Sequence, residues 1–186
     1  MSEAALREDL LPHYTYNDYA QWEGKWELIH GIPFSMVPAP TITHQRICKR
    51  IETHLDKLLE NCTHCEVFLP VDWQITEDTV VQPDVLIVCG DLDNIGPVKL
   101  EVTPVVVFEV ISPSTKKKDR LIKYDLYEKA GVKYYCIIDP AMKSATVFSL
   151  QTTGQKYEDR GEFREGKIPL DLGPCIIDVD FGEIFR

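Results

Sequence analysis

Two carboxylates and a lysine stand in the most apolar parts of this sequence. Asp84 follows Pro83 and opens a run of Val, Leu and Ile, and Glu109 stands inside the apolar run 105–111. Burying an ionised carboxylate without a partner is costly, or it forces the group to take up a proton. We therefore expect a cation beside these acidic groups.

Lys123 is the candidate for that cation. A helix is predicted over 116–130, and steps of about 100° per residue place Lys123 on the arc that packs against the sheet. The predicted packing arc holds Asp119, Ile122, Lys123, Leu126, Tyr127 and Ala130, and the predicted exposed arc holds Arg120, Asp125, Glu128 and Lys129. Asp119 lies one turn before Lys123 on the same side.

This constellation has two interpretations. A buried ion pair between Lys123 and Asp119 or Glu109 could fix the helix on the sheet without any further role. Two strand carboxylates facing one lysine leave negative charge unpaired, however, and a divalent cation would neutralise it. Hard oxygen ligands favour Mg²⁺ or Mn²⁺ over zinc.

The elements that position these residues can be predicted from hydrophobic patterns. Residues 26–37 predict a β-hairpin, with Gly31 near the bend. A helix is expected over 44–61, with Thr41 or Thr43 as its cap and with an apolar stripe. That stripe consists of Ile47, Ile51, Leu55, Leu58 and Leu59.

Strands account for most of the remaining chain. Three are predicted over 66–75, 80–88 and 105–111, another follows the 116–130 helix at 134–138, and short ones occur at 145–149, 155–159 and 176–179. Gly131 is expected to stop the helix. The predicted fold is α/β: a mixed sheet flanked by helices, with an N-terminal hairpin and short C-terminal strands. We expect an arm over 1–13 and a single domain over 14–186.

The charge balance restricts how such a protein meets nucleic acid. The chain of 186 residues has a formal net charge of −10, which argues against broad binding through Lys and Arg. A nucleic-acid substrate would have to be bound locally, with metal offsetting repulsion. Lys116, Lys117 and Lys118 form the only basic run; a solvated helical turn is the favoured interpretation, and contact with a phosphate is the alternative.

The six cysteines indicate a reducing compartment. Cys89, Cys136 and Cys175 adjoin Val and Ile runs, which is typical of buried, reduced thiols. The pair Cys62 and Cys65 has zinc-ligand spacing but no second pair at finger spacing, so a helix-to-strand connection with reduced thiols is favoured over zinc. With no signal peptide and no apolar run long enough for a bilayer, we expect a cytoplasmic protein.

The order of these residues resembles a known pattern. Gln82-Pro83-Asp84 followed by Glu109-Val110-Ile111 is similar to the PD-(D/E)XK nuclease superfamily. More closely, the chain resembles the Uma-type restriction endonuclease family, once described only as a domain of unknown function. The resemblance runs from about residue 14 to 179 and includes 26–31, 109–115, 119–123 and 130–140.

The resemblance implies roles for individual residues. Asp84, Glu109 and the carbonyl of Val110 would hold the metal. The superfamily lysine normally stands two residues after the Glu, where this chain has Ile111, and Lys123 on the next helix would replace it. Glu27 would be a further acidic catalytic residue, Asp119 would support Lys123, and His44, where the family often has His, would be a supporting residue or a helix-surface residue. His30 and Cys136 depart from the family pattern.

The implied activity is hydrolysis of a phosphodiester by a Mg²⁺-activated water, leaving a 5′-phosphate. We expect a DNA endonuclease that forms a homodimer. Two alternatives remain open: a dimeric interaction module whose acidic site is vestigial, and a nuclease acting on RNA or on a small phosphodiester.

Overall fold

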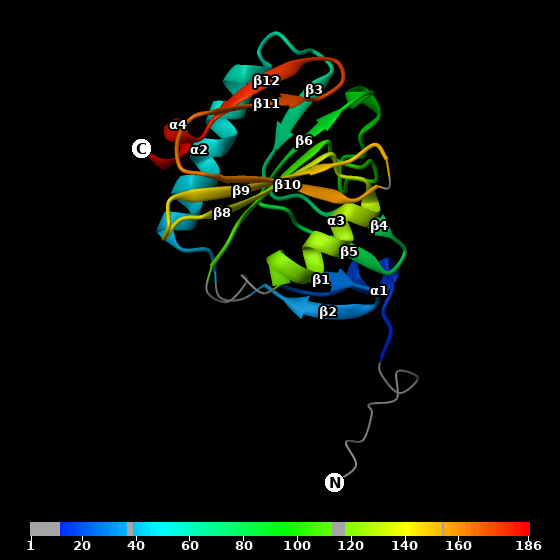
Figure 1. Cartoon of the computed structure of the whole chain (residues 1–186). Helices are drawn as coiled ribbons and strands as arrows, with labels where there is room; N and C mark the ends of the chain where they lie inside the picture. The colour runs from blue at the N-terminus through cyan, green and yellow to red at the C-terminus, as the bar shows by residue number, and fades with distance from the viewer. Residues whose placement is uncertain (1–11, 37–38, 113–117, 154) are drawn as a thin grey trace.

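The fold is built around a six-stranded mixed sheet. The computed structural model describes residues 12–36, 39–112, 118–153 and 155–186. The strands of this sheet lie in the order β10-β9-β8-β7-β6-β3 (Figure 1). Their bounds are β3 (Cys65–Phe68), β6 (Val85–Cys89), β7 (Val106–Val110), β8 (Tyr134–Asp139), β9 (Ser144–Leu150) and β10 (Tyr157–Phe163). β7 and β8 are parallel and the other neighbours are antiparallel.

Two smaller sheets accompany it. A four-stranded antiparallel sheet has the order β2-β1-β5-β4, and β11 pairs with β12 as a separate hairpin. Their bounds are β1 (Trp26–Ile29), β2 (Ile32–Ser35), β4 (Trp73–Thr76), β5 (Thr79–Val81), β11 (Lys167–Asp171) and β12 (Ile176–Asp180).

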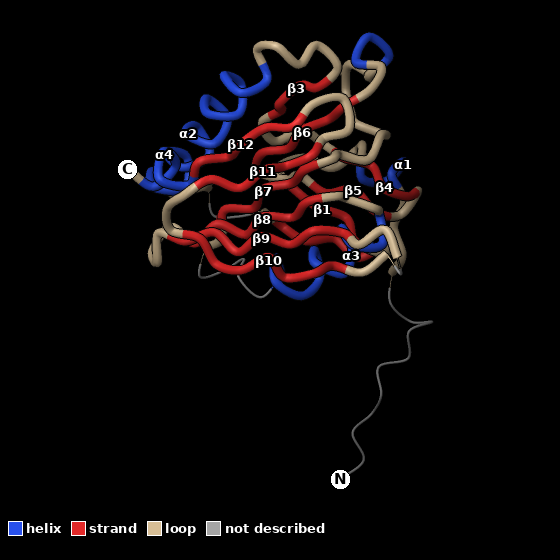
Figure 2. The backbone as a smooth tube through the Cα atoms, turned by 45° about the horizontal axis from the view of Figure 1, so that its top comes forward, coloured by secondary structure: helices blue, strands red, loops and turns tan. Residues whose placement is uncertain are grey.

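The helices cover both faces of the main sheet. The α-helices are α1 (Tyr16–Tyr19), α2 (Ile42–Leu59), α3 (Tyr124–Ala130) and α4 (Phe181–Phe185); η2 (Leu92–Asn94) is a 3₁₀ turn and η3 (Lys118–Lys123) is π-helical. α2, α4 and the β11–β12 hairpin lie on one side, and α3 and the four-stranded sheet lie on the other (Figures 1 and 2). None of the described helices is long and apolar enough to cross a membrane.

Alternation along β7 assigns Glu109 to one of these two sides. Val106, Phe108 and Val110 belong to the core under α2, whereas Val107 and Ile111 belong to the core shared with α3 and the four-stranded sheet. Successive side chains of a strand point to opposite faces. Glu109 therefore points toward α3 and the four-stranded sheet.

Several predicted elements are confirmed. The hairpin is present as β1 and β2, and its two turn residues, His30 and Gly31, have positive φ angles of 51° and 74°. α2 carries the predicted apolar stripe on its buried face, and the Thr41 hydroxyl accepts a hydrogen bond from the amide of His44 at 3.2 Å. The predicted arm falls largely on residues 1–11, outside the described part of the chain.

Two predicted strands are each divided in the structure. The segment 66–75 forms β3 and β4, and the segment 80–88 forms β5 and β6, with each pair split between the two larger sheets. Pro70 and Pro83 stand in the two breaks, and proline has no amide hydrogen to donate to a ladder. The second break matters because Asp84 lies where the chain passes from one sheet to the other.

The predicted helix 116–130 is irregular at its start. Residues 113–117, which include the first two residues of the predicted helix, Lys116 and Lys117, lie outside the described residues. The helix is π-helical from Lys118 to Lys123. A π-helical turn contains more residues than an α-helical turn. A prediction that places residues at 100° steps therefore assigns some of them to the wrong side of the helix. Ile122 is 39% exposed and Glu128 only 6%, the reverse of the prediction for both.

The C-terminal third is richer in structure than predicted. β9 and β12 match the expected strands, β10 begins later than expected, and β11 and α4 were not predicted. β11 buries Ile168 and Leu170 on either side of Pro169. Two apolar residues around a proline are too short a pattern to predict a strand.

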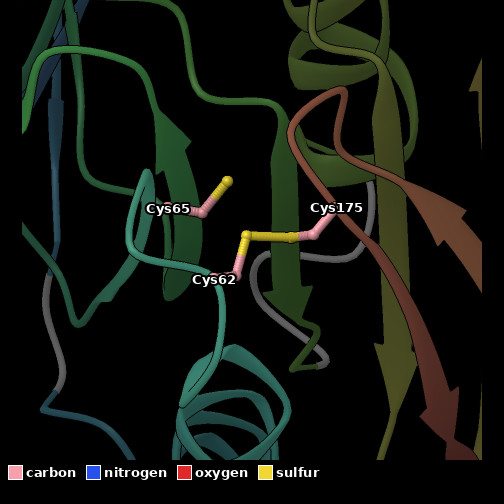
Figure 3. Close-up of side chains that lie close together, drawn as sticks. All are labelled: Cys62, Cys65 and Cys175. Carbon is pink, nitrogen blue, oxygen red and sulfur yellow. A yellow bond between two sulfur atoms is a disulfide. The ribbon is translucent and has the colours of Figure 1, made fainter.

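The prediction of reduced thiols was wrong for four of the cysteines, Cys62, Cys65, Cys89 and Cys175. Cys89 forms a disulfide with Cys65. Cys175 forms one with Cys62, which Figure 3 shows. Cys65 and Cys89 are opposite partners on β3 and β6, and the second pair is separated by 113 residues in the sequence, so strand register and tertiary packing bring them together. Cys136 is free and buried, as predicted.

Candidate active site

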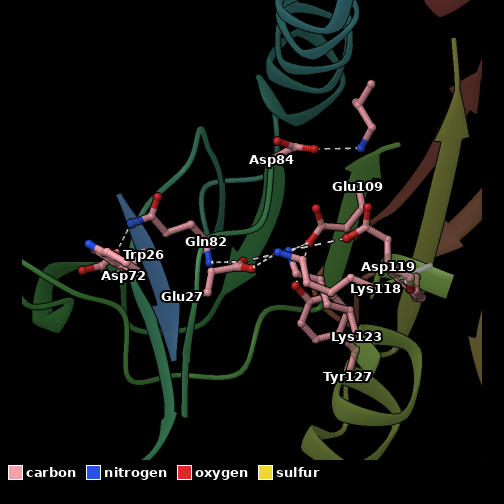
Figure 4. A network of polar contacts seen from close by, with 12 residues as sticks. Trp26, Glu27, Asp72, Gln82, Asp84, Glu109, Lys118, Asp119, Lys123 and Tyr127 are labelled. Atoms are coloured by element: carbon pink, nitrogen blue, oxygen red, sulfur yellow. Dashed lines mark hydrogen bonds and ion pairs between the residues drawn. The ribbon is translucent and has the colours of Figure 1, made fainter. Parts of the chain in front are cut away.

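Lys123 lies at the centre of a buried cluster of carboxylates. Its Nζ is 2.8 Å from Glu27 Oε1, 2.8 Å from Glu109 Oε1 and 3.9 Å from Asp119 Oδ1 (Figure 4). The residue is only 2% exposed. The predicted inward direction of Lys123 and its proximity to Glu109 are therefore present in the structure.

The cluster joins separate parts of the fold. Glu27 comes from β1 in the four-stranded sheet, Glu109 comes from β7 in the six-stranded sheet, and Lys123 comes from η3. The π-helical turn directs both Asp119 and Lys123 inward, since both are almost fully buried. Lys123 thus forms an ion pair with a carboxylate from each of the two sheets.

Glu27 is fully buried and held by three donors. It accepts hydrogen bonds from Lys123, from the amide of Gln82 at 3.0 Å and from Lys118 Nζ at 2.5 Å. Burial alone would raise the pKa of its carboxyl, but the ammonium groups of Lys123 and Lys118 outweigh burial and lower it. Lys118 is therefore part of this cluster, and the favoured prediction of a solvated turn was wrong for it.

The pKa of Glu109 is shifted in the opposite direction from that of Glu27. Burial raises the pKa of its carboxyl well above the usual value, and the nearby carboxylates add to this while Lys123 opposes it. For Lys123, burial lowers the pKa of the amine, but the surrounding carboxylates raise this pKa by more than burial lowers it. The amine therefore stays charged. The cluster therefore holds more carboxyl groups than its lysines can pair, and Glu109 is the one whose ionised form burial disfavours.

Two tyrosines complete the packing around these charges. The Tyr127 hydroxyl donates to Glu109 Oε1 at 2.7 Å, and the Tyr135 hydroxyl donates to the carbonyl of Asp119 at 2.8 Å. Both rings are completely buried. Tyr127 was predicted only as part of the packing arc, and Tyr135 only as part of the strand 134–138, although a buried tyrosine hydroxyl normally needs a partner.

Asp84 lies beside Glu109 but has different partners. The antiparallel register pairs Val85 with Phe108, so one further step places Asp84 opposite Glu109. Asp84 Oδ2 accepts from the amide of Val110 at 2.8 Å and is 3.1 Å from His44 Nε2. The contacts of the described residues pair Lys123 with Glu109 and pair Asp84 with His44, so the three predicted residues occupy two adjoining groups.

His44 belongs to the second group. Its side chain is 17% exposed, so the interpretation as a surface residue was wrong. Burial lowers the pKa of the imidazole, but the bond to Asp84, its charge and a backbone hydrogen bond to Val110 together raise it.

Cys48 was not predicted as a site residue. Its Sγ is 3.5 Å from His44 Nδ1, and the potential ligand atoms of His44, Cys48 and Asp84 all lie within 4.8 Å of one another. Burial, and then the charge of Asp84, raise the pKa of the Cys48 thiol. The only sequence signal was its position one helical turn after His44.

These residues fit a divalent cation. Four carboxylates face two ammonium groups in the two adjoining groups: Glu27, Asp84, Glu109 and Asp119 against Lys118 and Lys123. With all four carboxyl groups ionised, as metal ligands are, and His44 neutral, the difference is two negative charges, which is the charge of one divalent ion. A protonated thiol is a poor ligand, so the donors are mainly oxygens, which suits Mg²⁺ or Mn²⁺.

A family of known proteins matches most of this chain. The model of the Uma2 family, described as "Putative restriction endonuclease", matches residues 16–172. The chain belongs to the Uma2 family. No curated protein matches the chain at a significant level.

Uma2 membership is accompanied by a similar solved structure. A crystal structure from Anabaena variabilis, titled as a "putative nuclease belonging to DUF820", superposes with a TM-score of 0.72 at 15% identity and covers 92% of this chain and 97% of that one. At this identity the likeness supports the restriction endonuclease-like fold alone. The Uma2 match includes Glu27, Asp84, Glu109 and Lys123.

Proposed function

We propose that this protein is a metal-dependent phosphodiester hydrolase that cleaves DNA as an endonuclease. Membership of the Uma2 family supports a nuclease-like function. The observation that carries the proposal is the charge imbalance around Lys123, where carboxylates from two sheets and a helix surround one amine. An imbalance of this size inside a protein is expected where a cation binds.

In this proposal Asp84, Glu109 and the Val110 carbonyl hold Mg²⁺ or Mn²⁺. A bound divalent cation would lower the pKa of a water molecule and neutralise charge developing on the phosphate. His44 orients the Asp84 carboxylate through its Nε2, and Tyr127 orients Glu109 through its hydroxyl. Both keep their carboxylates facing the ligand position.

Lys123 acts as a fixed positive charge beside the reacting phosphate. Glu27 and Asp119 hold its position, and its raised pKa keeps it charged at every physiological pH. Lys118 adds a second positive charge, since it pairs with Glu27. Lys116 and Lys117 lie outside the described residues, and we propose that they contact a phosphate of the substrate. These local positive charges would attract the substrate phosphate despite the overall net charge of −10.

We further propose that the protein is cytoplasmic and forms a homodimer, because two-fold oligomers are the commonest.

A second candidate function follows from how completely the site is packed. Glu109 is 3% exposed and Lys123 is 2% exposed, and they bond directly to each other. A buried pair of this kind can exist for structure alone. The protein would then be a non-catalytic interaction module with a vestigial acidic site.

Nicking of a supercoiled plasmid separates the two functions. We expect cleavage by the wild type with Mg²⁺ or Mn²⁺, none with chelator, and a loss of about 100-fold or more in Lys123→Ala, since one preorganised charge contributes that much. Lys133→Ala is the matched control, because Lys133 pairs with Asp171 at 2.9 Å on the surface. Cleavage that persists in Lys123→Ala, or no cleavage with either metal, contradicts the proposal. A parallel assay on RNA tests the choice of substrate.

A further inference from the structure

Four cysteines from distant parts of the chain meet at one end of α2. Cys62 follows α2, Cys65 begins β3, Cys89 ends β6 and Cys175 lies in the connection between β11 and β12. Figure 3 shows the Cys62–Cys175 disulfide with the Cys65 side chain nearby. We call these four residues the cysteine cluster.

Three sulfurs of the cluster lie close to one another. The Sγ atoms of Cys62, Cys65 and Cys175 lie within 4.8 Å of one another, and the Sγ of Cys89 is bonded to that of Cys65. Tetrahedral zinc has Zn–S bonds of about 2.3 Å, which places its four sulfurs about 3.8 Å apart. Three of the four sulfurs are therefore near the spacing that zinc needs, and Cys89 would turn toward them once its bond to Cys65 is broken.

The backbone around the cluster is also suited to zinc. Cys62 and Cys65 have the C-x₂-C spacing of zinc ligands, and the amide of Cys65 donates to the carbonyl of Cys62 at 3.1 Å, which closes a turn. The amide of Gly90, next to Cys89, donates to the carbonyl of His64 at 2.8 Å. Three of the four cysteines are thus held in place without any bond between sulfurs.

The cluster is enclosed but reachable. Cys62 is 7% exposed and Cys65 is 6% exposed. A cavity of about 700 Å³ beside them is lined by Thr63, His64, Glu66, Gly90, Asp91, Leu92 and Asp93. Its three carboxylates favour the approach of a cation.

We propose that the reduced protein binds one Zn²⁺ through the thiolates of Cys62, Cys65, Cys89 and Cys175, a structural site that alternates with the two disulfides. Reduction of both disulfides by two dithiol molecules transfers four electrons and four protons, and the two dithiols become disulfides. The four thiols then release their protons as the sulfurs bind Zn²⁺. Oxidation reverses these steps and releases the ion.

This site is separate from the proposed phosphodiesterase site. Cys175 lies three residues beyond the segment 16–172 that matches the Uma2 family, so the fourth ligand lies outside the matched part of the chain. The cluster also joins the β11–β12 hairpin to β3 and β6 of the main sheet. In either redox state it would hold the C-terminal hairpin on the core.

The test uses full-length protein reduced with a phosphine, freed of reductant and titrated anaerobically with Zn²⁺ and with Co²⁺. We expect one equivalent of Zn²⁺ to bind, and Co²⁺ to give thiolate charge-transfer bands and the visible bands of tetrahedral cobalt. Alkylation followed by mass spectrometry should show four of the six cysteines protected by zinc. Protein with both disulfides intact should bind no zinc at the cluster.

Variants locate the ion. Cys175→Ser should weaken zinc binding by about 100-fold and change the cobalt spectrum, because one of four thiolates is lost. Cys136→Ala should bind as the wild type does, and Cys48→Ala tests whether the ion instead occupies the group with His44 and Asp84. Reduced wild-type protein that binds no stoichiometric zinc overturns the proposal, and so does a cobalt spectrum that Cys175→Ser leaves unchanged. The wild-type titration needs no variant and settles the question even if Cys175→Ser fails to fold.

Discussion

Replacing Lys123 with methionine tests the charge balance of the site most directly. Methionine keeps much of the length of the side chain but removes the ammonium group that lies 2.8 Å from both Glu27 and Glu109. Removing one partner of a buried ion pair costs about 3–5 kcal/mol because the remaining charge is left uncompensated. For a protein of this size, that corresponds to a melting temperature lowered by about 6–20 °C.

The loss should depend on pH in a defined direction. Glu109 has a raised pKa in the folded protein, so its protonated form favours folding; this contribution is present below its ordinary pKa of 4.5 and is lost as pH rises through the folded-state value. Without Lys123, which lowers that pKa, the folded-state value rises further. The stability difference between wild type and Lys123→Met should therefore be smaller at about pH 4 than near pH 7, and the part that remains at pH 4 comes from Glu27, whose pKa Lys123 lowers.

Urea unfolding at several pH values measures this difference. Lys133→Met is the matched control, because the pair of Lys133 with Asp171 is exposed and should contribute no more than about 1 kcal/mol. A loss below about 1 kcal/mol in Lys123→Met, or the same loss at both ends of the pH range, would refute the view that this lysine compensates buried carboxylates.

Three further predictions concern the ligands. Tyr127→Phe removes the hydroxyl that donates to Glu109, so unfolding by urea should show a loss of about 1–3 kcal/mol; unchanged stability would contradict the assigned contact. Mn²⁺ at about 100 times its Kd should stabilise the wild type by about 2.7 kcal/mol in thermal unfolding, and an equal effect on Asp84→Asn would place the ion elsewhere. Calorimetry should show Mn²⁺ binding that tightens by up to about tenfold per pH unit where protonated Glu109 must lose its proton. The pH dependence should flatten in Glu109→Gln, and a slope that survives there would assign the titration to another group.

Much of the fold could be predicted because its strongest patterns are local. The stripe of α2 and the apolar run of β7 are set by burial of neighbouring residues, and Glu109 was conspicuous because a charge interrupts such a run. The prolines at positions 70 and 83 are visible in the sequence as possible breaks. The sequence does not show that the chain passes from one sheet to the other at each of them.

The missed parts of the site depend on contacts between distant elements. Tyr127 and Tyr135 look like core residues until their hydroxyl partners are known. His44 and Asp84 meet across 40 residues of sequence. The π-helical turn changed which residues face inward, and no spacing rule for an α-helix predicts Ile122 outside and Glu128 inside. The disulfide partners likewise depend on strand register.

The position of Glu27 limits how far this protein can be shortened. A fragment starting at α2 would retain Asp84, Glu109 and Lys123, and thus every residue that the superfamily pattern requires. It would lack the β1–β2 hairpin, leaving β5 without its neighbour β1 and Lys123 without one of its two nearest carboxylates. The smallest unit that keeps this arrangement must therefore include the first hairpin, although the hairpin lies outside the six-stranded sheet.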